Sequence, residues 1–225
     1  MTEPVTEADA IGGRPPNYDA NVFINCPFDS DYAALLRPLL FTVVHAGLNP
    51  RIASERLDSG ETRVGKICEL ICESRYGIHD ISRIKAVQAD EFYRLNMPFE
   101  LGIDYGARRF GCSFLQEKRH LVLEEKPYAY HKALSDLSGS DIKSHRNEPD
   151  EIVRAVRDWL YDTCEMDTLE YPAVIWSEFN DFASSLLEFR VAEGVPERAA
   201  REDVERMPET EYVHSIRLWL SGDAG

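Results

Sequence analysis

The sequence predicts an α/β protein in which a doubly wound parallel sheet of four to five strands is followed by a helical appendage at the C-terminus. Two observations carry this prediction. Short apolar runs alternate with amphipathic segments of helical length over the first 125 residues, which is typical of parallel strands joined by right-handed crossovers. Beyond residue 165 the remaining segments have helical spacing.

The expected domain organisation follows from these patterns. Residues 1–19 are polar and rich in Gly, Pro, Glu and Asp, so we expect a disordered leader. The α/β domain is expected over 20–164 and the appendage over 165–225. Four apolar runs have the length and flanking residues of buried strands, and no fifth run is evident. These runs are 21–26, 48–53, 75–81 and 119–123.

Helices are expected between and after these strands. The first covers 32–46, where Pro38 either kinks the helix or begins its main part and Gly47 is a suitable C-cap. The second carries apolar residues at i, i+3, i+4 and i+7. Later helices begin at Pro149 and cover 172–190, and a charged helical tail ends at Leu220. The residues of the second helix are Val64, Ile67, Cys68 and Ile71.

A further helix is expected to begin at Asn96, a reasonable N-cap, with Pro98 in its first turn. Five of its residues share one face, and we expect this face to pack against the sheet, where its two glycines allow close approach. Glu100 lies about 100° round from Phe99, at the flank of that face. The five residues are Phe99, Gly102, Ile103, Gly106 and Phe110.

Charge and composition exclude several classes of protein. The formal net charge of -15 and the lack of a Lys/Arg cluster argue against a nucleic-acid partner. No apolar run approaches the roughly 20 residues that cross a bilayer, and no signal peptide pattern precedes the fold, so we expect a cytoplasmic protein. The Gly-x-Ser-x-Gly elbow, the dinucleotide-binding fingerprint and the P-loop are absent.

The five cysteines lie in otherwise apolar segments, so we expect buried, reduced thiols. Cys68 and Cys72 are four residues apart on one expected helix face, a spacing that suits a metal ion. Two further ligands at suitable spacing are missing, and core packing is the preferred interpretation. We therefore expect no metal and no cofactor.

A candidate site lies at the end of the third strand. His79, Asp80, Ser82 and Arg83 follow one another at the strand exit, and Glu100 lies across the next loop in the first turn of a helix. In an open parallel sheet, ligands bind beyond the carboxyl ends of the strands, so these side chains are expected to line one crevice. Glu100 could instead be a surface residue that complements the helix dipole.

These residues carry a resemblance to a known family. Val22-Phe-Ile-Asn25, the loop after the second strand and the third strand before a Glu-bearing helix resemble the Toll/interleukin-1 receptor (TIR) domain and its relative, the nucleoside 2-deoxyribosyltransferase-like family. Asn96-Met-Pro-Phe-Glu-Leu-Gly102, after the strand end at Asp80, is similar to the transferase pattern of an acidic strand end followed by a Glu-Leu-Gly helix start. The resemblance covers roughly residues 20 to 125.

The resemblance implies a flavodoxin-like sheet and cleavage of an N-glycosidic bond, in NAD for catalytic TIR domains and in nucleosides for the transferases. Glu100 matches the family's glutamate, which contacts the ribose at the scissile bond. The His79-Asp80 pair and the long 83–95 loop depart from the plain TIR pattern, so the substrate stays open between these two classes. Bacterial proteins of this kind are often stress or antiphage effectors.

The expected chemistry assigns roles to the candidate residues. Cleavage of a ribosyl bond develops positive charge on the sugar, and the Glu100 carboxylate suits that charge. Asp80 either orients the ribose hydroxyls or a water, or caps the strand end. His79 either orients its neighbours or is a satisfied core histidine. Donors to the diphosphate are expected from arginines near strand ends and from the backbone ahead of the second helix. The remaining candidates are Arg51, Arg63, Arg83, Ser59, Asp29, Ser82 and Asn96.

Two alternatives remain beside NAD hydrolysis. One is a nucleoside deoxyribosyltransferase, and the other is a non-catalytic TIR-like module that binds a nucleotide or a partner and signals by assembly. Loss of Glu100 would mark the module, and Glu100 is present, which favours an enzyme. The aromatic helix over 172–190 is either core or a self-association surface, so we expect a homo-oligomer or an activating partner protein.

Overall fold

The structure, a computed structural model, describes residues 13–83 and 95–222. Contacts divide the chain into two compact units. Among the described residues, the sheet unit comprises 13–28, 49–83 and 95–146, and the helical unit comprises 29–48 and 147–222. Helices α1 (Ala33–His45) and α5 (Pro149–Asp162), which were expected to belong to the sheet domain, group with the C-terminal helices.

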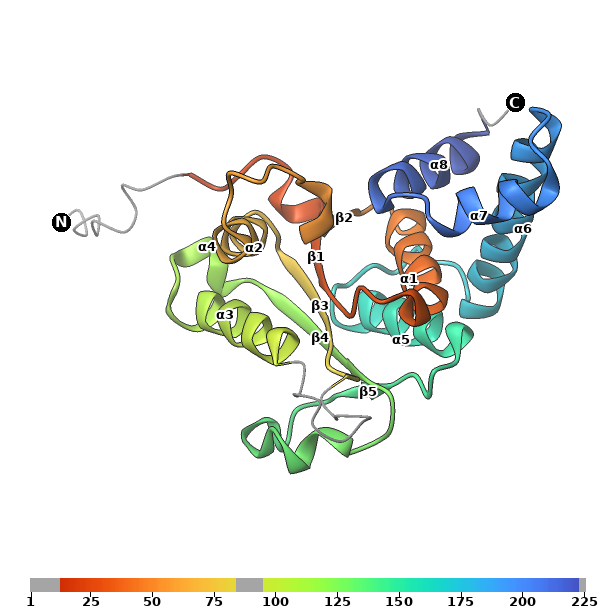
Figure 1. Ribbon diagram of the computed structural model, residues 1–225. Helices are drawn as coiled ribbons and strands as arrows, with labels where there is room; N and C mark the ends of the chain where they lie inside the picture. The colour runs from red at the N-terminus through yellow and green to blue at the C-terminus, as the bar shows by residue number, and fades with distance from the viewer. Residues whose placement is uncertain (1–12, 84–94, 223–225) are drawn as a thin grey trace, which may run out of the picture. The chain divides into compact units, whose positions relative to one another are not determined.

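Five strands form one sheet in the order β2-β1-β3-β4-β5 (Figure 1). All neighbouring strands are parallel, and Ile24 of β1 lies between Ile52 of β2 and Ile78 of β3. This order is the flavodoxin-like variant of the doubly wound sheet, so the predicted fold class is confirmed. The strands are β1 (Asn21–Asn25), β2 (Asn49–Ile52), β3 (Tyr76–Asp80), β4 (Arg119–Glu124) and β5 (Lys143–Ser144).

Strand β5 was not expected from the sequence. It has two residues, and it pairs with β4 through Leu123 opposite Lys143 and Glu124 opposite Ser144. A strand of this length has too few residues to show the alternation of polar and apolar side chains by which strands are recognised. Its position is therefore decided by pairing with β4.

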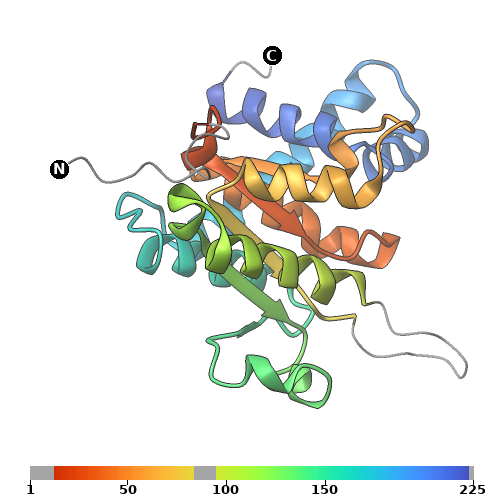
Figure 2. The same ribbon diagram turned by 90° about the vertical axis from the view of Figure 1, so that its left-hand side faces the viewer.

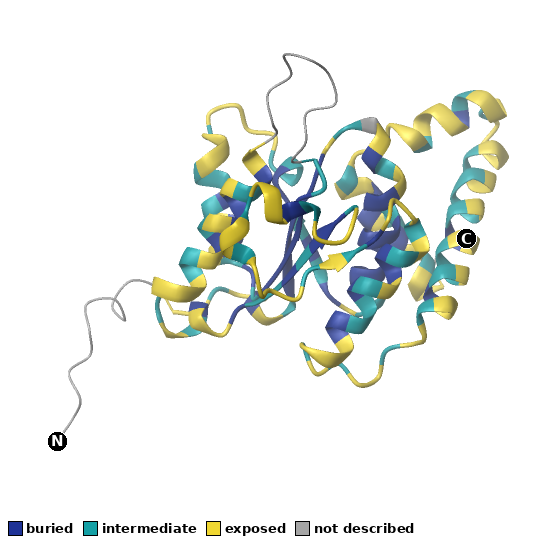
Figure 3. Cartoon of the chain, turned by 90° about the horizontal axis from the view of Figure 1, so that it is seen from below, coloured by how far each residue is buried: buried dark blue, intermediate teal, exposed yellow. Residues whose placement is uncertain are grey.

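Helices α2 (Arg63–Cys72) and α3 (Asn96–Phe110) lie side by side against the sheet (Figure 2). The hydroxyl of Thr62 accepts a hydrogen bond from the backbone N–H of Gly65 and so caps α2. Strands β1 and β3 are buried along their whole length (Figure 3). The other helical segments of the sheet unit are α4 (Ser113–Gln116), η2 (Tyr18–Ala20), η4 (Ala53–Glu55), η5 (Ala129–Lys132) and η6 (Ser135–Leu137).

The start of the fold differs from the expected boundary at residue 20. Residues 1–12 of the expected leader lie outside the described residues. Tyr18, however, is buried, and its hydroxyl donates a hydrogen bond to the carbonyl of Phe114. Its own carbonyl accepts a hydrogen bond from the backbone N–H of Arg75. Residues just before β1 are therefore part of the packed unit.

Helix α3 presents to the sheet a face that differs from the expected one, although Ile103 of the expected face packs against the core. Phe99 and Phe110 are 57% and 85% exposed, and a Cβ atom added at Gly102 or Gly106 would meet open space. The buried side chains come from the other side of the helix. The N-cap is Leu95, so Asn96 is the first helical residue and not the cap. The buried residues are Met97, Glu100, Leu101 and Asp104.

In the helical unit, aromatic side chains from distant parts of the sequence form one core. Phe41 of α1 stacks on Phe182 at 5.6 Å between ring centroids, and both rings lie 6.0 Å from Trp219. Of the described residues, none belongs to a helix both long and apolar enough to cross a membrane. The other helices of this unit are η3 (Ser30–Tyr32), α6 (Pro172–Ala192), α7 (Glu197–Glu205) and α8 (Glu209–Ser221).

Candidate functional site at the carboxyl edge of the sheet

Glu100 is a buried carboxylate near the start of α3, just beyond the first turn in which the sequence placed it. It is 4% exposed, and Oε1 lies 4.0 Å from Nη2 of Arg63, the first residue of α2. The N-terminal parts of two helices therefore bring together two predicted site residues, one buried and one largely exposed. Burial raises the pKa of Glu100 above its ordinary value, and the charge of Arg63 opposes that increase.

Phe28 adds an aromatic ring that sequence reasoning missed. It follows β1 in the chain, is 40% exposed, and lies 5.9 Å from the Arg63 guanidinium. A guanidinium at this distance from a ring is within the range of cation–π attraction. An exposed phenylalanine in a loop after Pro27 carries no periodic signal, so only its proximity to Arg63 marks it.

Asp80 organises the exit of β3. Its Oδ1 accepts hydrogen bonds from the backbone N–H of Ser82, at 2.8 Å, and from the Ser82 hydroxyl. Nε2 of the buried His145 lies 3.1 Å from Asp80 Oδ2 and 2.9 Å from the Ser82 hydroxyl oxygen. Both contacts use one ring nitrogen, whereas a serine-protease-like relay uses the two ring nitrogens for different partners. His145 lies 63 residues beyond Ser82, so no local pattern could reveal it.

His79 is fully buried in a polar cluster beneath the strand ends. Its Nδ1 lies 3.1 Å from the side-chain nitrogen of Asn25, and its Nε2 lies 2.9 Å from Oδ2 of Asp104. Asp104 Oδ1 lies 3.2 Å from both Lys118 Nζ and His120 Nε2. These contacts match those of a satisfied core histidine. Sequence reasoning did not identify these partners, because they come from different strands and helices that are far apart in the sequence.

Electrostatics fix the charge states of this cluster. Burial opposes ionisation of Asp104, but the contacts with His120 and His79 and the charge of Lys118 hold its pKa well below its usual range. Burial lowers the pKa of His79 despite the neighbouring carboxylate. The cluster therefore contains an ionised aspartate and a neutral His79 at neutral pH.

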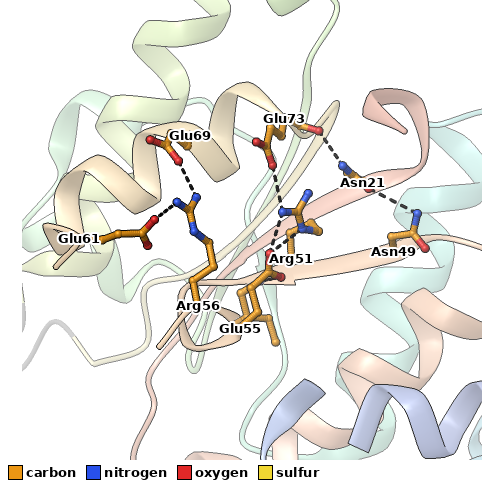
Figure 4. Close-up of polar contacts among 9 residues, drawn as sticks. Asn21, Asn49, Arg51, Glu55, Arg56, Glu61, Glu69 and Glu73 are labelled. Carbon is orange, nitrogen blue, oxygen red and sulfur yellow. Dashed lines mark hydrogen bonds and ion pairs between the residues drawn. The ribbon is translucent and has the colours of Figure 1, made fainter. Parts of the chain in front are cut away.

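Arg51 is engaged by carboxylates of its own unit (Figure 4). Its guanidinium lies 2.7 Å from Glu55 and 3.0 Å from Glu73. Arg56, which was not among the predicted site residues, contacts Glu61 and Glu69 in the same way (Figure 4). The donors of Arg51 that were expected to bind a diphosphate thus contact two carboxylates.

The other predicted residues are distributed more widely. Ser59 is exposed, and the backbone N–H of the next residue, Gly60, donates to the Asp58 side chain. Asp29 belongs to the helical unit, where its carboxylate accepts a hydrogen bond from the Tyr32 backbone. Arg83 follows β3 and is partly buried, and Asn96 is exposed at the start of α3.

A separate hollow of about 330 Å³ lies on the other side of α3 and contains none of the predicted site residues. The hollow is lined by Pro98, Leu101, Gly102, Tyr105 and residues 133–137.

The described residues contain no group of three or more His, Cys, Asp or Glu arranged to hold a metal ion, and all five cysteines are free.

Comparison of the chain with protein-family models, curated proteins and solved structures gives no match. The fold and the site define an α/β protein of flavodoxin-like strand order with a buried glutamate at the carboxyl edge of its sheet.

Proposed function

We propose that this protein cleaves the N-glycosidic bond of a nucleotide and that its substrate is NAD, from which it releases nicotinamide. The observation that carries the proposal is the Glu100 carboxylate, buried at the edge where parallel sheets bind ligands and facing the Arg63 guanidinium at 4.0 Å. In a bacterial cell such consumption of NAD would serve a stress or antiphage response, as the resemblance of residues 96–102 to the family pattern implies.

The chemistry requires one negative charge close to the anomeric carbon. As the glycosidic bond breaks, positive charge develops on the ribose, and a preorganised carboxylate stabilises it more strongly where water is excluded. Nicotinamide leaves from a cationic ring, so a strong general acid is unnecessary. Glu100 would stabilise the ribosyl cation, and Asp80 would orient a ribose hydroxyl or the attacking water.

Arg63 and Phe28 would bind the rest of the nucleotide. The Arg63 side chain is 59% exposed, so it can contact a phosphate while it faces Glu100. An exposed aromatic ring beside it offers a surface on which a base can stack. The other residues proposed to line the site are Ser59, Ser82, Arg83 and Asn96.

A second candidate function is a non-catalytic module that binds a nucleotide and signals by assembly with another copy or with an activating partner. The observation in its favour is that Glu100 is almost fully covered by protein, which leaves little of its carboxylate for a sugar. A nucleoside deoxyribosyltransferase uses the same glutamate, and the substrate test separates it from an NAD hydrolase.

The test is release of free base from NAD, nucleosides and deoxynucleosides by the purified chain. Glu100→Gln keeps the size of the side chain but removes its charge, so binding should survive while turnover falls at least about 10²-fold. Arg63→Ala should instead raise KM more than it lowers kcat at neutral pH. Arg201→Ala, whose exposed side chain pairs with Glu197 on α7, is the control.

Binding of NAD without cleavage by the wild-type chain would favour the non-catalytic module. Full cleavage by Glu100→Gln would contradict the proposed mechanism. Base release from deoxynucleosides alone, with transfer to a second base, would identify the transferase.

A further inference from the structure

The apolar residues of α3 explain its orientation about its own axis only in part. Met97 and Leu101 are buried in one apolar cluster and Ile103 and Ala107 pack against another, but the helix also buries Glu100 and Asp104. At about 100° per residue, Phe99 and Phe110 lie roughly 200° and 220° round the helix from Met97, on the exposed side. Met97 and Asp104 lie within about 20° of each other, on the buried side, and Glu100 lies about 60° from Met97. Two ionisable residues thus face inward while two phenylalanines face outward.

Asn25 makes the first polar contact that holds this orientation. It is the last residue of β1 and is 2% exposed. Its side-chain nitrogen donates a hydrogen bond of 2.8 Å to the carbonyl of Met97, in the first turn of α3. Glu100 follows this carbonyl by three residues, so the bond acts on the helical turn that carries the glutamate.

His79 makes the second contact, about two turns further along the helix, at Asp104. The amide nitrogen of Asn25 must face the Met97 carbonyl, and its other proton then points to Nδ1 of His79. Nδ1 therefore accepts, which places the proton of the neutral ring on Nε2, and Nε2–H donates to Asp104. The donor and the acceptor of all three hydrogen bonds, from Asn25 through His79 to Asp104, are thereby assigned.

Asp104 is in turn contacted by Lys118, a fully buried side chain with partners of its own. Lys118 Nζ lies 3.2 Å from it and also donates to the carbonyls of Ile71 and Ser74. Gly77 of β3 leaves the required space, because a Cβ atom there would lie 2.4 Å from Asp104 Oδ2. Met97 and Asp104 are thus attached to the sheet on either side of Glu100.

We propose that Asn25, His79 and Asp104 are positioning residues: together they fix the rotation of α3 and hold Glu100 toward the carboxyl edge of the sheet. The catalytic part of this inference rests on the proposed function, whereas the positional part does not. Each of the three acts through the helix rather than on a substrate.

Asn21 supplies a matched control. It lies at the other end of β1, is 3% exposed, and its side-chain nitrogen also donates to a helix-end carbonyl, that of Glu73, at 2.9 Å (Figure 4). The two asparagines therefore have the same strand, burial and type of hydrogen bond. They differ in the helix that they contact, so Asn25→Leu and Asn21→Leu should cost similar stability but have different effects on Glu100.

The experiment measures the titration of the Glu100 side chain by ¹³C NMR, with the resonance assigned from its absence in Glu100→Gln. Asn25→Leu should move the midpoint from its raised wild-type value toward the ordinary value of a glutamate, and Asn21→Leu should leave it in place. If the wild-type chain cleaves NAD, Asn25→Leu should also lower kcat at least about tenfold with little change in KM.

If Asn25→Leu does not fold, Asn25→Ser provides the same comparison, because its short hydroxyl cannot reach both Met97 and His79. An unchanged Glu100 midpoint in a folded Asn25 variant, or an equal shift in Asn21→Leu, would overturn the positioning role. Absence of NAD cleavage by the wild-type chain would instead count against the proposed function, and the NMR titration would still decide the positional part.

Discussion

At the scale of single residues, the site depends on a carboxylate that burial makes harder to ionise and on one cation that offsets this effect. Burial of Glu100 raises its pKa, and Arg63 at 4.0 Å lowers it again. A buried negative charge stabilises a cationic transition state more strongly than an exposed one, because few water molecules screen the interaction. The same burial means that the charge is lost at a higher pH than for an exposed glutamate.

This balance predicts the acid limb of the pH profile. Cleavage requires ionised Glu100, so kcat/KM should fall as the pH drops through the raised pKa of the free enzyme. Arg63→Ala removes the cation that lowers this pKa, and the limb should move to higher pH. A limb that stays in place or moves to lower pH in Arg63→Ala, relative to Arg201→Ala, would contradict the assignment of the limb to Glu100.

At the scale of elements, β3 and α3 meet through polar groups where apolar packing is the usual solution. Gly77 makes this possible, since a larger residue at position 77 would displace Asp104 or His79. Buried polar groups cost stability unless every partner is in place, so the fit between this strand and this helix is narrow.

Gly77→Ala tests that fit. The added methyl group would lie 2.4 Å from Asp104 Oδ2 and 2.9 Å from His79 Nε2, both fully buried. We expect a loss of about 1–3 kcal/mol or more in the free energy of unfolding. Gly102→Ala, on the open side of α3, should be neutral or gain up to about 1 kcal/mol from helix propensity. Urea denaturation of both variants measures the contrast, and equal effects would show that Gly77 is not constrained by the cluster.

At the scale of the whole molecule, the helical unit is assembled from two distant parts of the sequence. Helix α1 is separated by about 100 residues from α5, yet both belong to this unit. The rings of α6 and α8 pack on Phe41 of α1. Phe182 of the aromatic stripe over 172–190 is therefore part of the core, and a chain ending near Thr163 would leave Phe41 without its partners on α6 and α8.

Two phenylalanines of α6 separate a core role from a self-association role. Phe182 is 1% exposed and contacts Phe41, Tyr212 and Trp219, so Phe182→Ala should cost about 3–5 kcal/mol. Phe189 on the same helix is 48% exposed, and its replacement by Ala should change the unfolding free energy by less than about 0.5 kcal/mol. Thermal unfolding and light scattering check both. A Phe182→Ala protein of unchanged stability but altered oligomeric state would show that the stripe is an interface.

The sequence was sufficient for features that depend on neighbours along the chain. Strands β1 to β4, the helix with Pro149 at its start and the apolar periodicity of α2 follow from local patterns of apolar and proline residues. These patterns also indicated the strand exit at Asp80 and a glutamate near the start of the next helix, which lies just beyond the first turn. Strand β5, which has two residues, showed no such local pattern in the sequence.

Tertiary contacts decided which face of α3 lies inward and which residues meet there. The apolar pattern favoured Phe99 and Phe110, but Met97, Glu100 and Asp104 face inward. Asn25 and His79 contact Met97 and Asp104 there, and Met97 also joins an apolar cluster with Leu101. The physical reason is that a buried carboxylate is stable only beside donors, and those donors come from other strands, far away in the sequence. The grouping of α1 with the C-terminal helices has the same origin, since an apolar face does not specify which distant face will cover it.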